Sequence, residues 1–182
     1  LGSGTLTGPL SVTSSGDITD TGTLAVTGTT TLAASTTGNI TLDDTSNNFG
    51  TVVVTSGLAV TLVDTNAIDL GASTVTGALD VTSGAGITDS GALSVGTTSR
   101  FEVAGSSDIT LDSTGTYTGA VTFTATSGNI GNITIIDTGA ITVSAGTITS
   151  LSVTSTTGAV VLAGITSATT LNATASGGTI TD

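Results

Sequence analysis

Carboxylates are the residues of this chain best suited to chemistry, and they recur just after short apolar runs. Asp43 and Asp44, followed closely by Asn47 and Asn48, form the densest cluster of side-chain oxygens. Calcium takes six to eight oxygen ligands, so this cluster is a calcium-binding candidate. Alternatively, Asp and Asn occupy corners because their side chains satisfy local backbone groups. The second interpretation is favoured, because the sequence has no EF-hand loop and no glycine-rich nonapeptide repeat.

The acids recur at similar positions along the chain, and a stacked column of them would be a second way to hold calcium. Paired carboxylates also serve glycoside hydrolysis. Such sites normally add cations and aromatic platforms for the sugar, whereas this chain has one Arg, no Lys and no Trp. We therefore expect no catalytic residues, and a polysaccharide-cleaving enzyme is the least favoured function. The recurring acids are Asp20, Asp43, Asp44, Asp64, Asp89, Asp112 and Asp137.

Composition excludes several other functions. The chain has no His and no Cys, so the usual ligands for zinc, haem and iron–sulfur clusters and the thiol nucleophile are missing. A single Arg against 13 acids gives a formal net charge of -12. Because that charge repels phosphate backbones, we expect no nucleic-acid partner. No apolar stretch approaches the roughly 18 residues of a membrane-spanning helix.

The elements that must position these acids are short strands. Two apolar side chains separated by a small or polar one recur along the chain, as in Leu24–Val26, Ile40–Leu42, Leu79–Val81 and Ile109–Leu111. This alternation is the period of a strand with one buried face. A helical spacing of apolar residues is never sustained. The sequence therefore predicts an all-β protein.

A longer repeat is superimposed on the alternation. The segment 8–55 realigns with 77–124 at a shift of about 69 residues, so that Ile18–Asp20 matches Ile87–Asp89. Internal repeats of this kind are typical of solenoids. We expect residues 1–182 to form a single β-solenoid domain. Because the phrase Ile-Thr-Asp returns at residues 180–182, we also expect it to be part of a longer repeat array or a filament subunit.

Parallel coiling is favoured over an antiparallel sandwich. Hairpins prefer Asn-Gly or Asp-Gly turns, and neither occurs here. Three strands would make a coil of about 20–24 residues, giving a right-handed parallel β-helix of roughly eight coils. Equivalent side chains would then lie above one another. The small number of aromatic residues fits this arrangement, because we expect a thin core to leave little room for rings.

Several phrases resemble the strand repeats of large bacterial secreted adhesins of the filamentous-haemagglutinin group. They include Gly38–Asp44, Asn47–Gly50, Asp64–Gly71 and Leu79–Ser83. The resemblance implies a right-handed parallel β-helix, export to the bacterial surface, and service as a stalk or fibre shaft. Repeats of this group carry no catalytic residues, so the resemblance assigns none here.

The leading hypothesis is a non-enzymatic extracellular structural protein, the shaft of a bacterial adhesin or self-assembling surface filament. Its partner would be copies of itself, stacked end to end or laterally, because open β-helix ends are unpaired strand edges. The alternative is an adhesin repeat that binds a surface glycan or ice through Thr-rich faces. Cofactors are expected to be absent apart from the calcium candidate. Sequons for N-glycosylation, whose use depends on the host, begin at Asn39, Asn132 and Asn172.

Overall fold

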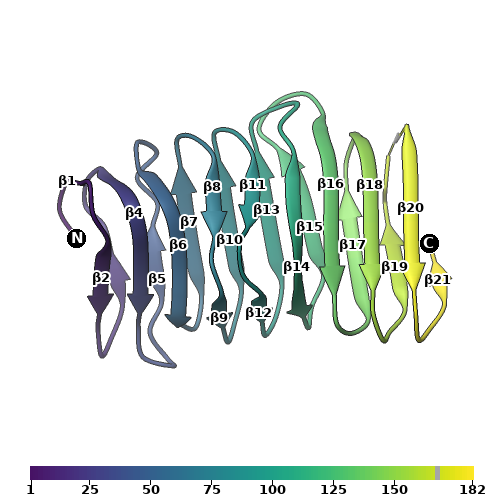
Figure 1. Ribbon diagram of the computed structural model, residues 1–182, viewed down its shortest axis with the longest axis horizontal. Coiled ribbons are helices and arrows are strands. Elements are labelled where there is room, and N and C mark those ends of the chain that lie inside the picture. Colours follow the sequence, from purple (N-terminus) through teal and green to yellow (C-terminus); the bar gives the residue numbers. More distant parts are fainter. Residues whose placement is uncertain (167–168) are drawn as a thin grey trace.

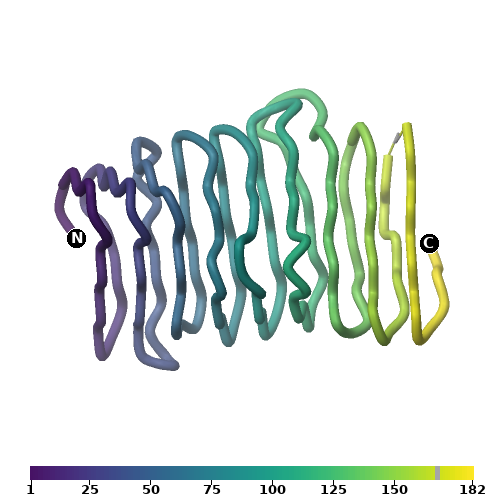
Figure 2. The backbone as a smooth tube through the Cα atoms, in the orientation of Figure 1, coloured from purple at the N-terminus to yellow at the C-terminus, as the bar shows by residue number. Residues whose placement is uncertain are grey.

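The chain winds into a right-handed parallel β-helix of about nine turns, which confirms the predicted fold class. Figures 1 and 2 show the turns side by side along one axis, from the N-terminal turn to the C-terminal turn. The computed structural model describes residues 1–166 and 169–182, and these contain no helix. Register partners on neighbouring turns lie 18 to 24 residues apart.

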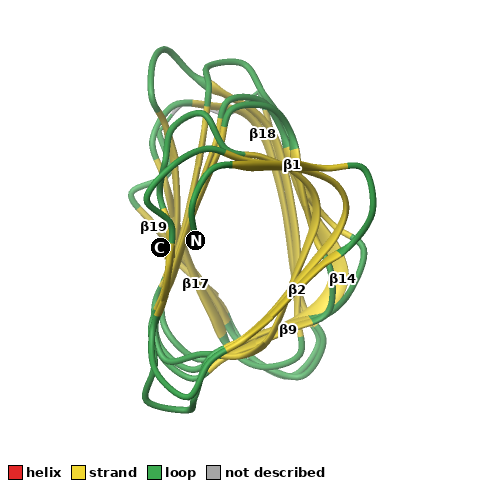
Figure 3. Ribbon diagram, turned by 90° about the vertical axis from the view of Figure 1, so that its left-hand side faces the viewer, coloured by secondary structure: helices red, strands yellow, loops and turns green. Residues whose placement is uncertain are grey.

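All strand pairings are parallel, and each turn has three sides (Figure 3). In the first, fourth and fifth turns each side is a separate strand, whereas in the other turns one long strand covers two sides. The strands are β1 Gly4–Leu6, β2 Leu10–Thr13, β3 Ile18–Thr19, β4 Leu24–Ala33, β5 Ile40–Leu42, β6 Asn48–Ser56, β7 Val60–Asp64, β8 Ile68–Leu70, β9 Ser73–Val75, β10 Leu79–Ser83, β11 Ile87–Asp89, β12 Leu93–Val95, β13 Ser99–Val103, β14 Ile109–Tyr117, β15 Val121–Ala125, β16 Ile130–Asp137, β17 Ile141–Ala145, β18 Ile148–Ser155, β19 Val160–Ala163, β20 Thr170–Ala175 and β21 Ile180–Thr181.

We name the sides in the order in which the chain meets them. The first face contains β1, β8, β11 and the opening halves of the long strands. The second face contains β2, β9, β12 and the closing halves. The third face is a nine-stranded sheet running from β3 at one end to β21 at the other.

The core consists of aliphatic ladders that run along the axis. On the first face, Ile68, Ile87, Ile109, Ile133 and Leu151 stand in register over five turns. Burying each such side chain contributes about 1.5–3 kcal/mol. The three-sided interior also holds rings: Phe101 and Phe123 stack with centroids 5.8 Å apart. All four aromatic residues are buried, so the expectation that the core has little room for rings is wrong.

Glycines occupy corners between the faces, including the corner between the second and third faces. A Cβ added to Gly96 would lie 2.1 Å from the carbonyl oxygen of Thr76, and one added to Gly158 would lie 2.3 Å from the amide nitrogen of Ala140. Both corners therefore lie directly against the preceding turn, where only a residue without a side chain fits.

Candidate functional site

The predicted calcium cluster is organised by Asp20, at the end of β3. Its carboxylate accepts hydrogen bonds from the backbone amides of Asp43 (3.2 Å) and Asp44 (3.4 Å) on the next turn. The side-chain amide of Asn47 donates to it as well, at 2.6 Å. Three N–H groups thus converge on one carboxylate, and together they fasten this corner to the following turn.

The four candidate ligands do not converge on a common point. Asn47 is fully buried, and its Oδ1 accepts from the backbone amide of Leu24 at 2.7 Å. Asp44 accepts from the amide of Ser46 at 2.9 Å in a local turn, while Asp43 and Asn48 are exposed. No group of three or more acids able to hold a metal ion occurs in residues 1–166 and 169–182. The cluster therefore has the geometry of a corner clamp.

The recurring acids do not form one column, contrary to the idea of a stacked acid ladder. Asp20, Asp44 and Asp64 lie where the third face ends, whereas Asp89 and Asp137 lie inside the stretch between the first and second faces. These five positions therefore do not form one continuous row of carboxylates, which a ladder of cations would need.

Asp89 forms a second clamp of the same kind. Its Oδ1 accepts from the backbone amides of Asp112 (2.9 Å) and Ser113 (3.1 Å), at the point where β14 shifts register. Asp64 and Asp137 are more deeply buried. Asp64 accepts from the amide of Phe49 at 2.5 Å, and Asp137 from that of Tyr117 at 2.9 Å.

Burial raises the pKa of Asp64, Asp89 and Asp137, and this effect outweighs the backbone hydrogen bonds that lower it. Among the buried side-chain oxygens that have no hydrogen-bond partner in the described part of the chain are Oδ2 of Asp89 and Oη of Tyr117. Burial, with smaller contributions from Asp89 and Asp137, also raises the pKa of the Tyr117 phenol. The phenol is therefore protonated at neutral pH and is not a general base.

Arg100, the one cationic side chain, lies on the outer surface of the third face. Its guanidinium donates to Asp80 across the strand pair at 2.8 Å and to Glu102 on its own strand. All three side chains are partly exposed. Arg100 thus pairs with two carboxylates, Glu102 on its own strand and Asp80 on the preceding turn.

Hydroxyl side chains line the outer surface of the first face. Thr88, Thr110, Thr134 and Ser152 stand in register on four consecutive turns. On the third face the matching row of Thr19, Thr41 and Thr61 is interrupted by Asp80 and Arg100 before it resumes at Thr122 and Ser144. The first face is therefore the more uniform hydroxyl surface.

The three sequon asparagines are exposed and lie on, or immediately before, strands. Asn39 accepts from the amide of Ala59 at 3.2 Å, and Asn132 donates to Asp108 at 3.2 Å and accepts from Ser150 at 2.7 Å. Asn172 lies in β20. The side chains of Asn39 and Asn132 are therefore already engaged with neighbouring turns.

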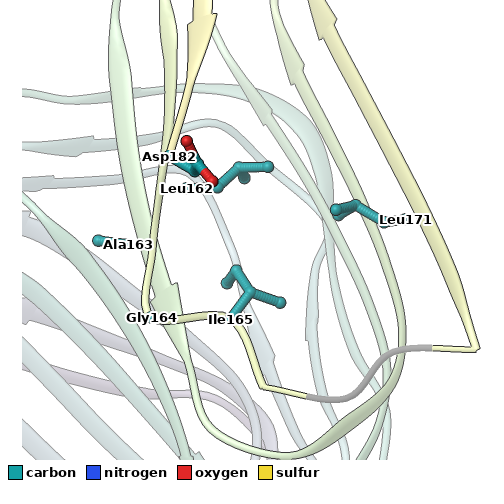
Figure 4. Close-up of a pocket in the computed structure, with 6 residues that line it drawn as sticks. All are labelled: Leu162, Ala163, Gly164, Ile165, Leu171 and Asp182. Atoms are coloured by element: carbon teal, nitrogen blue, oxygen red, sulfur yellow. The ribbon is translucent and has the colours of Figure 1, made fainter.

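The C-terminal turn leaves the interior open. Leu162, Ile165, Leu171 and Asp182 surround an opening of about 520 Å³ (Figure 4). Leu171 is 48% exposed and Ile180 49%, although both continue buried ladders. Apolar side chains of the last two turns described therefore line this opening.

Sequence reasoning missed that Asp17 and Asp108 are also inter-turn clamps, accepting from the amides of Asn39 and Asn132 at 2.8 and 2.6 Å. Each acid lies 22 to 24 residues before its donor. The signal available in the sequence was an acid that precedes the start of a strand by about one turn.

Comparison with known proteins gives one match. A family of repeats of unknown function (DUF5649) matches residues 1–56 and 57–124, which correspond to β1–β6 and to β7 through most of β15. No curated protein and no solved structure matches. No described helix is both long and apolar enough to cross a membrane. Two consecutive matches cover more than half of the sequence, and the chain belongs to this family of DUF5649 repeats.

Proposed function

We propose that this chain is a section of the shaft of a bacterial surface fibre or adhesin, an extracellular structural element without catalytic activity. The observation that carries the proposal is the unbroken parallel pairing from β3 to β21 along the third face. Along this face each turn is hydrogen-bonded to the next, so an axial load is shared by many backbone bonds. The resemblance to filamentous-haemagglutinin repeats supports the same function.

The polar groups of the chain support a mechanical function. Several buried or half-buried carboxylates and hydroxyls fasten one turn to another, as with Asp20, Asp64 and Ser155. All four aromatic side chains are buried, so none is available as a platform for a sugar. These features favour a shaft over a polysaccharide-cleaving enzyme.

The proposed partner is a further unit of the same fold stacked on an end turn. Such a unit placed on β20 and β21 would cover Leu171 and Ile180 and continue both ladders. Strand edges of this kind recruit further strands. Leu171→Glu with Ile180→Glu should therefore abolish end-to-end association in sedimentation and negative-stain microscopy. Leu58→Glu, at an exposed corner within the shaft, is the control that should leave association unchanged. Monomers at high concentration without any substitution would contradict the stacking proposal.

Resistance to trypsin tests the shaft itself. The single trypsin site follows Arg100, in a strand paired on both sides by β10 and β15. The folded chain should stay intact over hours, whereas Ser127→Arg, in an exposed corner, should be cut at its new site. Rapid cleavage after Arg100 under native conditions would contradict a continuous, rigid shaft.

The hydroxyl row of the first face favours a second candidate, the binding of ice or a surface glycan. Thr134→Lys would interrupt this row, and Thr41→Lys would alter the third face as a control. Loss of ice-recrystallisation inhibition or of glycan-array binding in the first variant alone would support this candidate. Absence of both activities in the unsubstituted chain would exclude it.

A further inference from the structure

The repeat in the sequence does not return to the same side of the β-helix. Ile18–Asp20 and Ile87–Asp89 are equivalent in sequence, but the first begins in β3 on the third face and the second forms β11 on the first face. Ile40 and Ile109 behave in the same way, in β5 and β14. A shift of about 69 residues therefore corresponds to three whole turns and about one third of another.

Equivalent hydrogen bonds recur at equivalent positions of the two repeats, although these positions lie on different sides of the β-helix. Asp20 accepts from the amides of residues 43 and 44, and Asp89 accepts from those of residues 112 and 113, which are the same positions one repeat later. The first clamp lies at the corner that ends the third face, and the second lies at the bend that ends the first face. The same pair of backbone contacts is thus rebuilt one side further round.

A second pair of clamps is similar but less regular, because Asp64 lies 15 residues after its donor and Asp137 lies 20 residues after its donor. Asp64 accepts from the amide of the buried Phe49, and Asp137 from that of the buried Tyr117. Phe49 and Tyr117 are one repeat apart within a residue or two, and both acids close an Asx turn, onto Asn66 and Gly139. The same sequence pattern can therefore occupy different faces of the β-helix, and the same clamp can occupy different corners.

The physical reason lies in the strands. Each side needs only a short alternating run with inward aliphatic side chains, and each clamp needs only an acid about one turn before or after its donors. Neither requirement depends on which of the three sides carries it. A repeat that ends one third of a turn late is consequently no less stable than one that ends on a whole turn.

We propose that arrays of these repeats form a threefold screw, in which each repeat displays its outward residues one side further round the shaft. A given outward position then returns to the same side only after three repeats, or ten turns, about 48 Å along the axis at 4.8 Å per turn. Thr19 and Thr88 illustrate this, since both are exposed but belong to different sheets.

The interaction surface follows from this geometry. A flat partner, such as a wall polymer or a neighbouring shaft, would meet the same residues of only one repeat in three. Partners that recognise a single repeat would instead find copies on all three sides, about 16 Å apart along the axis. The inference depends on the repeat geometry and not on the proposed extracellular function.

Duplication tests the screw. A second copy of residues 57–124 inserted after Thr124 should lengthen the continuous β-helix by about 16 Å in solution scattering. Nitroxides on Thr88→Cys in both copies should be clearly further apart than those on Thr88→Cys with Ser152→Cys, which stand in register on one face three turns apart. Equal distances for the two pairs would overturn the proposal.

Two controls make the outcome decisive. Duplicating residues 79–120 adds two whole turns, because Leu79, Ser99 and Val121 are in register. If this whole-turn variant folds and the 57–124 variant does not, faces are not interchangeable and the proposal fails. In the chain of original length, nitroxides at Thr19→Cys and Thr88→Cys should also be further apart than the Thr88/Ser152 reference. A separation equal to the reference would likewise overturn it.

Discussion

The first six turns and the last three have the same fold but are fastened by different chemistry. Up to Asp112 the chain carries all but two of its acids, and carboxylates such as Asp20 and Asp89 hold backbone amides of the next turn. Beyond it, hydroxyls dominate: Ser155 accepts from the amide of Gly158 at 2.8 Å and donates to the carbonyl of Gly139 at 2.5 Å.

The difference shows that the parallel backbone ladder determines the shape, while the corners can be fastened by different kinds of side chain. A carboxylate accepts several N–H groups at once and carries charge into the corner. A serine donates and accepts without charge. The acid-rich turns should therefore respond to pH and to loss of a single side chain more strongly than the hydroxyl-rich turns.

The corner glycines should give a large effect, and the same one in both regions. Gly96→Ala and Gly158→Ala each force a Cβ against backbone of the preceding turn, and overpacking of this kind costs about 1–3 kcal/mol. Urea unfolding would measure the loss of free energy. Gly146→Ala, with no atom within 4 Å of the added Cβ, is the control. Equal stability of all three variants would contradict close stacking of the corners.

Substitutions at the clamps should destabilise the acid-rich turns more than the hydroxyl-rich turns. Asp20→Ala removes an acceptor of three N–H groups and should cost about 2–3 kcal/mol, because hydrogen bonds to charged groups contribute about 1.5–3 kcal/mol. Ser155→Ala should cost about 1 kcal/mol. The same urea titration applies to both variants. A larger loss for Ser155→Ala would reverse the comparison.

Acidification should stabilise the fold. The pKa of Asp64, Asp89 and Asp137 is raised in the folded state. Their contribution is complete below the unfolded pKa of about 3.9 and is lost as the pH rises through the folded values. The thermal midpoint should therefore be higher at pH 4 than at pH 7.

Asparagine substitutions identify the groups responsible. Asp64→Asn with Asp89→Asn should flatten most of this pH dependence, because both acids belong to the acid-rich turns. Asp137→Asn should remove a smaller part. A thermal midpoint that falls on acidification in the unsubstituted chain would show that these carboxyls are not destabilised by burial.

Loss of the exposed ion pair should reduce the stability of the fold least. Arg100→Met removes the contacts with Asp80 and Glu102, and exposed pairs of this kind contribute about 0–1 kcal/mol. Differential scanning calorimetry should detect a shift of the midpoint no larger than a degree or two. A loss comparable to that of Asp20→Ala would mean that ion pairing rather than backbone clamping supports the acid-rich turns.

Strand positions followed from the sequence because alternation is a local signal. The runs at Ile40, Leu79 and Ile109 all lie in strands with their aliphatic side chains inward. The corner interpretation of Asp and Asn was right about backbone groups. Many of the donors, however, lie on the next turn, a distance along the chain that local turn rules do not reach.

The use of each oxygen could not be predicted from the sequence. Asp43, Asp44, Asn47 and Asn48 form an oxygen-rich cluster in the sequence, yet Asn47 is buried and donates to Asp20. Orientation of an amide depends on which turn lies beneath it. The sequence also does not reveal that one repeat ends a third of a turn beyond three whole turns. The number of residues in a turn varies, and no residue type identifies one particular face.

Disulfide formation tests the parallel stacking most directly, since the chain contains no cysteine. The Oγ atoms of Ser144 and Thr122 lie 3.1 Å apart on neighbouring turns, so Thr122→Cys with Ser144→Cys should oxidise readily to an intramolecular disulfide. Thr116→Cys with Thr122→Cys, which would be neighbours in a hairpin of β14 and β15, should stay reduced. A disulfide in the second pair but not in the first would contradict a β-helix.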